Sequence, residues 1–409
     1  MRWFLIVILV VVALVGIGAV TFVRKWPFAR EAITKTLQDR FDRNVEIRDF
    51  QRTYFPPGFV ADQVSFEHRL RKDLPPLITV RKLIVQGSYS GLIGFHKSVP
   101  KIQVIGLHIL IPPKRKDGKS RNIMPLRAGK SNTLDVGEMK TNDAVLEFQS
   151  SDPEKEPFRL ELHELILKHI GSGGPISFQT TLRNTKPPGE IRSEGKFGPW
   201  NPDDPGSTPV SGSYAFANAD LGVFKGVTGT LSSTGNFHGT LDQIDCNGVA
   251  DVPNFQVRGS KHIVHLATEF QADVDAANGD TRLHNVRSRM QRTTVLSEGG
   301  VLGRPGRKGK IAALDMTVKE GRIDDFLRLF TGQKDASMTG PITLHAKVEV
   351  PSDKRKFLQK LNLEGDFGIG GAKLTNPSVQ VPINKLSQSA NGESKKQQAE
   401  DPRTVLSNI

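Results

Sequence analysis

The sequence has 409 residues but only one cysteine, Cys246, and aromatic side chains make up just 7% of it. A single cysteine excludes an intrachain disulfide framework and any metal site built from several thiolates. The chain also lacks the phosphate-binding loop GxxxxGK(S/T), the dinucleotide fingerprint GxGxxG and the nucleophile elbow GxSxG. We therefore expect the protein to be neither an enzyme nor a binder of a cofactor.

The histidine and acidic clusters do not form a catalytic or metal-binding pattern. His163-Glu164 is followed by its next histidine only at His169, whereas the zinc-binding pattern HExxH needs two histidines on adjacent turns of one helix. Asp324 and Asp325 begin an apolar run, where carboxylates favour the positive end of a short helix. We expect no catalytic residue and no metal site.

The net charge of +13 is confined to a few short segments. Residues 112–130 carry +6, while residues 304–310 and 354–360 carry +4 each, which leaves −1 for the rest. A continuous basic face for nucleic acid is therefore not expected. The basic loop 112–132 is either a solvated loop or a contact for anionic phospholipid head groups. Its candidate head-group contacts are Lys114, Arg115, Lys116, Lys119 and Arg121.

Residues 3–23 form an uncharged apolar run of 21 residues. A helix of this length is roughly 31 Å long, close to the roughly 30 Å hydrocarbon core of a bilayer. A cleaved signal peptide is the alternative, but the run is longer than a signal core and residues 16–18, Gly-Ile-Gly, make a poor cleavage site. We expect residues 1–25 to be a retained single-pass anchor. Flanking positive charges favour a cytoplasmic C-terminal side, although large domains cross regardless of that bias.

An amphipathic helix is expected within residues 26–43. Pro27 suits a first helical turn, and apolar residues recur every fourth position from Ala29 to Phe41. This stripe could lie on the membrane surface or cap the end of a sheet. Capping is the commoner use, and we favour it.

From residue 44 to residue 383, apolar and polar residues alternate, which is typical of strands with one buried face. Residues 262–276, 342–350 and 361–369 show this most clearly, and a change of parity after Leu162 indicates a β-bulge. Few helices are available to cover the apolar face, and glycines inside the strands permit strong curvature. We predict a mostly β fold with a long, curved, largely antiparallel sheet and a few short helices.

Residues 219–249 and 322–366 look like two copies of one unit, in which a short helical turn precedes glycine-punctuated strands. Thr228-Gly229 corresponds to Thr339-Gly340. Residues 384–409 are expected to form a polar linker and a truncated end, whose last apolar residues would need a strand partner elsewhere, such as another chain.

Several of these segments together resemble the AsmA-like family of bacterial envelope proteins. They are the anchor with its helix, residues 44–66, residues 80–112, and residues 321–330 with the strand that follows. The resemblance covers most of residues 1–383. It implies a single-pass protein of the inner membrane with its bulk in the periplasm. It also implies a β-sheet curled into a taco-like groove that guides phospholipid, although 409 residues are too few to bridge the periplasm alone.

The apolar faces of the clearest strands are the candidate floor of that groove. Acyl chains prefer such a floor by about 0.8 kcal/mol per buried CH₂ group. The alternative is a closed sandwich core in an anchored scaffold that assembles or regulates envelope machinery without carrying lipid. Expected partners are the inner membrane, phospholipid and envelope proteins. The candidate lining residues are Val264, Leu266, Phe270, Ile342, Leu344, Val348, Leu361, Leu363 and Phe367.

Overall fold

The structure is a computed structural model. It describes residues 28–68, 74–89, 98–113, 135–149, 157–170, 174–185, 187–201, 203–224, 226–276, 279–304, 309–331, 335–351, 355, 357–375 and 405–406. The predicted anchor and most of the polar linker lie outside these ranges. Within them, no helix has both the length and the apolar character to cross a bilayer.

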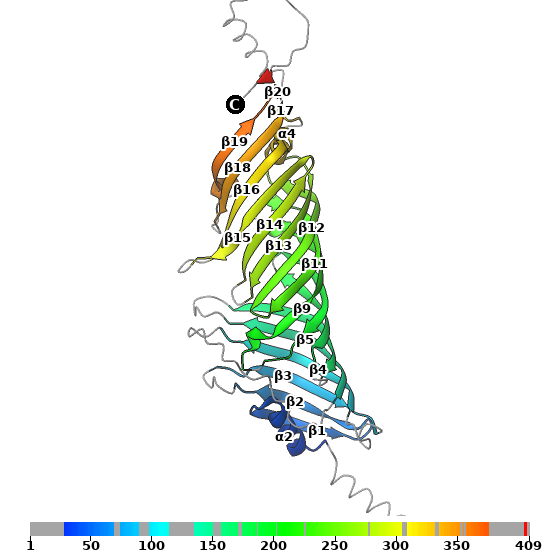
Figure 1. The fold of residues 1–409 in the computed structure, drawn as a ribbon. Coiled ribbons are helices and arrows are strands. Elements are labelled where there is room, and N and C mark those ends of the chain that lie inside the picture. The colour runs from blue at the N-terminus through cyan, green and yellow to red at the C-terminus, as the bar shows by residue number, and fades with distance from the viewer. Residues whose placement is uncertain are drawn as a thin grey trace, which may run out of the picture.

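The described part of the chain is mostly β, as predicted, and nearly all of its strands belong to one 18-stranded sheet (Figure 1). The strands of this sheet are β1 (Val45–Thr53), β2 (Gly58–Phe66), β3 (Ile78–Gln86), β4 (Ser98–Ile111), β5 (Asp135–Phe148), β6 (Phe158–Ile170), β7 (Ile176–Thr185), β8 (Pro188–Phe197), β9 (Pro209–Asp220), β10 (Val227–Thr228), β11 (Thr230–Thr240), β12 (Gln243–Val257), β13 (Val264–Asp275), β14 (Asp280–Met290), β15 (Thr293–Gly303), β16 (Lys310–Arg322), β18 (Pro341–Val350) and β19 (Asn362–Ile369).

Helices and small strands complete the described fold. The helices are α2 (Arg30–Phe41), α4 (Ile323–Phe330) and α5 (Phe357–Lys360), with 3₁₀ turns η1 (Pro205–Ser207) and η2 (Leu221–Val223). A second sheet contains β17 (Met338–Thr339), β20 (Ala372–Leu374) and β21 (Val405–Leu406). Because β21 pairs with β20, these last apolar residues have a strand partner within the same chain.

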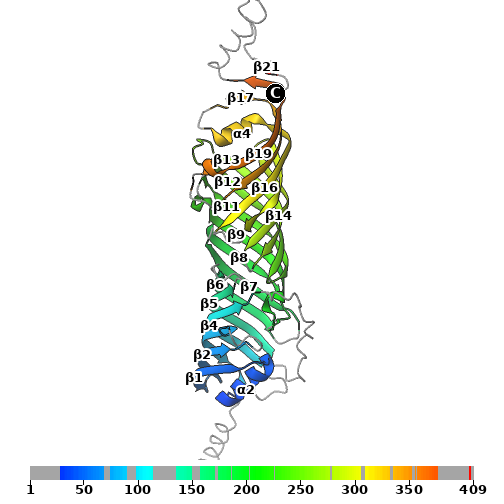
Figure 2. The same ribbon diagram turned by 90° about the vertical axis from the view of Figure 1, so that its left-hand side faces the viewer.

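The long strands pair with their neighbours in chain order, from β1 to β9 and then from β11 to β19. The pairings are antiparallel except for β4 with β5, which is parallel and makes the sheet mixed. The strands therefore stack along one long axis, with α2 at one end and α4 near the other (Figures 1 and 2).

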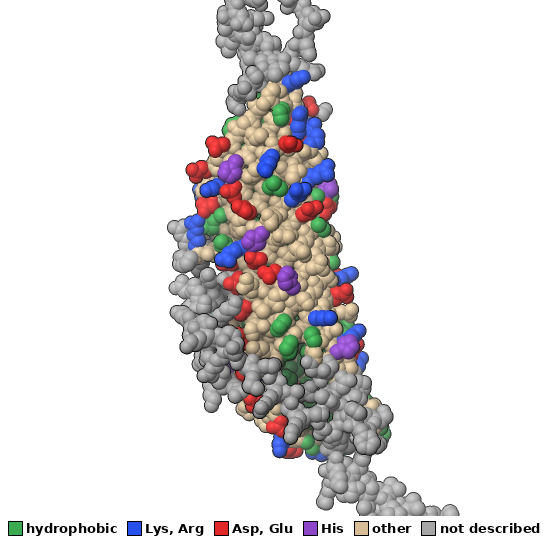
Figure 3. All heavy atoms as spheres, in the orientation of Figure 1, with side chains coloured by type: hydrophobic (Ala, Val, Ile, Leu, Met, Phe, Trp, Pro, Cys, Tyr) green, Lys and Arg blue, Asp and Glu red, His purple; other side chains and the backbone are tan. Residues whose placement is uncertain are grey.

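One face of the sheet is apolar and the other is polar, and we call them the inner face and the outer face. On β18, Ile342 and Ala346 are buried whereas Thr343 and His345 are exposed. β-Bulges preserve this division: Asn285, at φ 48°, is an extra residue in β14 that returns the next apolar side chain to the inner face. Figure 3 shows charged side chains distributed over one face of the molecule.

Short helices cover the inner face at both ends of the sheet. In α2, Ile33, Leu37 and Phe41 pack against the buried core of the first strands, so the predicted apolar stripe caps the sheet. In α4, Ile323 and Phe326 pack against buried residues of the last strands.

The sheet curls toward its inner face. Leu241 and Ala276, in the turns that follow β11 and β13, pack against Ile111 and Phe148 of β4 and β5. Cross-strand glycine pairs permit this curvature, because a Cβ at Gly235 would lie 2.1 Å from a backbone oxygen of the neighbouring strand.

The predicted internal repeat is present in the pairing pattern. In both copies a short helix is followed by a two-residue strand, a glycine and a long strand. The N–H of Leu221 donates to the carbonyl of Gly229, and the N–H of Ile323 donates to that of Gly340, at 2.9 and 3.0 Å. The short strand β10 pairs with β12, the strand after the long one, whereas β17 pairs with β20, the second strand after the long one.

Candidate functional site

The inner face changes character along the molecule. In β1 to β7 it is a packed core, with Val64, Val104 and Ala144 at most 3% exposed. From β8 onward most inner-face side chains are only half-buried, including Ile191 and Leu314. The buried core of the described sheet therefore lies over the first strands, and the apolar face over β8 to β19 is partly uncovered.

The predicted lining residues lie on this partly uncovered inner face. Val264 and Ile342 are buried, whereas most of the others are half-buried. Leu363 and Phe367 are 59% and 62% exposed and lie opposite Val348 and Leu344 across the last strand pair. Leu361 alone lies outside the strands, just before β19. The exposure rises toward the last strand, where apolar side chains face solvent.

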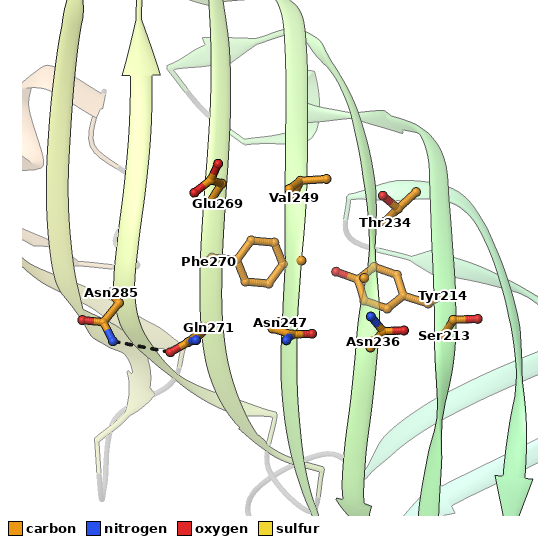
Figure 4. Close-up of a pocket in the computed structure, with 12 residues that line it drawn as sticks. Ser213, Tyr214, Thr234, Asn236, Asn247, Val249, Glu269, Phe270, Gln271 and Asn285 are labelled. Atoms are coloured by element: carbon orange, nitrogen blue, oxygen red, sulfur yellow. Dashed lines mark hydrogen bonds between the residues drawn. The ribbon is translucent and has the colours of Figure 1, made fainter.

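Two cross-strand glycine pairs leave positions without side chains in the middle of the inner face. Gly195 lies opposite Gly212, and Gly235 lies opposite Gly248. A hollow of about 640 Å³ lies where β9, β11, β12 and β13 pass the second pair. Its lining includes the inner-face rings of Tyr214 and Phe270 together with outer-face residues of the same strands, among them Asn247 and Glu269 (Figure 4).

A line of hydroxyl groups runs along the inner face, and sequence reasoning missed it. Strand register aligns the first three members, because Thr180 lies opposite Ser193 and Ser193 lies opposite Tyr214. Tyr214 then contacts Ser233 diagonally, at 3.1 Å. On β12 the line is interrupted by Ala250, which lies between Ser233 and Thr268. We call this line the hydroxyl track. Its members are Thr180, Ser193, Tyr214, Ser233, Thr268 and Ser288. Only the strand pairing reveals it, since its neighbours are separated by many residues in the sequence.

Burial perturbs two groups on the inner face. Desolvation raises the pKa of the Tyr214 phenol, partly offset by its hydrogen bond with Ser233. Desolvation also raises the pKa of the Cys246 thiol, and the charges of Asp273 and Asp245 add to that shift. Cys246 is thus a protonated, half-buried side chain at neutral pH and not an activated nucleophile.

The acidic pair has structural partners. Asp324 and Asp325 lie in the first turn of α4 and are 3% and 1% exposed. Asp325 Oδ2 accepts hydrogen bonds from the Arg292 N–H at 3.1 Å and from Thr293 Oγ1 at 2.8 Å. The pair therefore fixes α4 against the turn between β14 and β15.

His163 and His169 lie on strand β6, where the zinc-binding helical pattern does not apply. Among the described residues, no group of three or more histidine, cysteine or acidic side chains is placed to hold a metal ion. The five predicted head-group contacts, from Lys114 to Arg121, lie outside the described ranges.

No protein-family model matches this sequence, and no curated protein is significantly similar to it. The argument for function therefore rests on the inner face and on the residues that carry the resemblance.

Proposed function

We propose that this protein is a membrane-anchored periplasmic β-groove protein of the bacterial inner membrane. In this role it assists phospholipid transport or outer-membrane biogenesis and homeostasis. The observation that supports it best is the half-exposed apolar inner face of β8 to β19, which offers acyl chains a surface that a fully packed core would not offer. The apolar run at residues 3–23 supports the anchor, and the AsmA-like pattern supports the periplasmic location.

The apolar character of this inner face suits transfer more than selection of one lipid. Its large side chains are aliphatic or aromatic, so they bind acyl chains by burial without fixing one head group. The polar outer face keeps the other side of the same strands in contact with water. Such a surface holds a lipid through many weak contacts, which allows the lipid to move along it.

A matched pair of substitutions on β18 tests this proposal. Leu344→Glu places a carboxylate on the half-buried inner face, whereas Thr343→Glu places the same group on the exposed outer face. The full chain is purified in a mild detergent, and bound phospholipid is quantified by mass spectrometry. We expect the inner-face variant to lose most of the lipid and the outer-face variant to keep it. Equal lipid in all three proteins would refute a groove site.

A second role is favoured by a separate observation, the packed core of β1 to β7. A closed core is what an anchored scaffold of envelope machinery needs. In that case, crosslinking in cells traps stable protein partners, while Leu344→Glu leaves both those partners and the bound lipid unchanged.

A further inference from the structure

The hydroxyl track is the polar feature of an otherwise apolar surface. At the described inner-face positions of β7 to β14, strand register places no charged residue. Neighbouring strands lie about 4.8 Å apart, so the six steps from β7 to β14 extend the track for about 29 Å. Because the strands stack along the long axis, the track runs lengthwise and does not cross the molecule (Figure 1).

The hydroxyls of the track are bonded within the protein. Thr180 donates to the carbonyl of Glu164 and Ser193 to that of Ser213, both at 2.8 Å. These bonds reduce the cost of keeping polar groups on an apolar face. Each oxygen still has acceptor capacity, and each hydroxyl can rotate to an alternative acceptor.

The middle of the track is a directional chain. Ser233 Oγ donates to the carbonyl of Val249 at 2.9 Å, so at the 3.1 Å contact with Tyr214 the tyrosine is the donor. Thr268 and Ser288 bond each other at 3.1 Å, and since only one of them donates, the other keeps a free hydrogen. This end of the track can donate to a ligand without breaking any internal bond.

Apolar side chains flank the track on both sides. Phe178 and Phe237 lie along one side, and Phe216, Leu266 and Met290 lie along the other. A ligand that fits both features has apolar chains joined to an uncharged polar linkage. A phosphate does not fit, because the track offers it no Lys or Arg.

We propose that the hydroxyl track binds the ester linkages of glycerolipids, while the acyl chains lie on the flanking apolar side chains and the head group remains outside. This proposal rests on the proposed lipid function and adds the part of the lipid that is recognised. Hydroxyls recur on the long strands from β7 to β14 except β12, where Ala250 stands in the line. An ester can therefore exchange one hydroxyl for the next as the lipid moves lengthwise, with one longer step past Ala250.

The test compares two lipids that differ only in the linkage. The full chain is solubilised in a mild detergent with equimolar diester and diether phosphatidylcholine of the same chain length. Lipid retained through gel filtration is then quantified by mass spectrometry. The track variant combines Thr180→Val, Thr268→Val and Ser288→Ala. Thr234→Val, on the exposed outer face of β11, is the matched control.

We expect the wild type and the Thr234→Val control to retain about three- to tenfold more diester than diether lipid, as one or two hydrogen bonds allow. The track variant should retain the same total lipid at a ratio near one. If the triple variant does not fold, the double variant Thr268→Val with Ser288→Ala is tested in its place. These two side chains bond each other, so the double variant keeps the hydrogen bond from Thr180 to the backbone. A diester-to-diether ratio near one in the wild type would overturn the proposal that the track binds ester linkages. An unchanged ratio in the track variants would do the same. Retention of neither lipid overturns the proposed function itself.

Discussion

Arg43 and Asp203 are 160 positions apart, yet Arg43 Nη2 lies 2.6 Å from Asp203 Oδ1. Arg43 lies between α2 and β1, and Asp203 lies in the connection between β8 and β9. Their side chains are 3% and 15% exposed. The ion pair therefore fastens the middle of the curled sheet to its beginning.

Removal of one partner from this pair should destabilise the fold strongly. Asp203→Asn keeps the shape of the side chain but removes the negative charge that lies 2.6 Å from the buried guanidinium of Arg43. We expect a loss of about 3 kcal/mol in the free energy of unfolding, measured by denaturant titration. Glu190→Gln, in the exposed pair with Arg192, is the control and should change stability by less than about 0.5 kcal/mol. Equal effects of the two substitutions would show that the buried pair holds nothing together.

The Thr293 hydroxyl should hold α4 in place. Thr293→Val keeps the volume but removes the donor to Asp325 Oδ2 and the acceptor of the Arg322 N–H. Because Asp325 is buried, we expect a loss of about 1–3 kcal/mol and faster hydrogen exchange in α4. Thr294→Val, at the next position on the opposite face, should have little effect. Unchanged exchange in α4 would contradict this role.

The glycines of the cross-strand pairs should be required for the curvature of the sheet. Gly235→Ala would place a methyl group 2.1 Å from the carbonyl oxygen of Asn247, so one of the strands must move. We expect a loss of about 1–3 kcal/mol in the free energy of unfolding. Gly370→Ala is the control, since its Cβ would meet only the Pro341 ring at 3.8 Å. If both variants are equally stable, the close approach at Gly235 does not constrain the sheet.

The Cys246 thiol should make the protein less stable in alkali. Burial raises its pKa in the folded state, so the folded state keeps the proton more tightly than the unfolded chain does. The stabilisation is complete below the ordinary pKa of 9.0 and is lost as the pH rises through the higher folded value.

Unfolding titrations of the wild type and Cys246→Ala between neutral and strongly alkaline pH check this expectation. The difference in stability between the two proteins should be constant near neutrality and shrink above about pH 9. A stability difference that grows with pH would mean that folding lowers the pKa of the Cys246 thiol and does not raise it. The same thiol should also react slowly with maleimide at pH 7, because the thiolate is the reactive form.

Local pattern predicted much of the fold. The alternation at 262–276 and 342–350 corresponds to β13 and β18, and the change of parity after Leu162 corresponds to a register shift between β6 and β7. The apolar stripe on α2 predicted that this helix caps the end of the sheet. In each case, the signal depends on residues within a few positions of one another, where period and packing are directly coupled.

Long-range pairing set the limit of prediction. The ion pair of Arg43 with Asp203 and the hydroxyl track both depend on strand register, which no single strand encodes. The change from a packed core to a half-exposed face near β8 also depends on the curl. The predicted lining residues could be placed on one face because each strand carries its own apolar stripe, whereas the track crosses strands and has no periodic signal.

The equivalent hydrogen bonds of Leu221 with Gly229 and of Ile323 with Gly340 make the sheet modular. One unit begins at η2 and the next begins at α4, and the six long strands from β11 to β16 lie between them. At about 4.8 Å per strand, the interval from η2 to α4 corresponds to about 29 Å of length. Duplication of one unit would lengthen the molecule without altering α2 or α4, so its reach is set by the number of units rather than by any change in the caps.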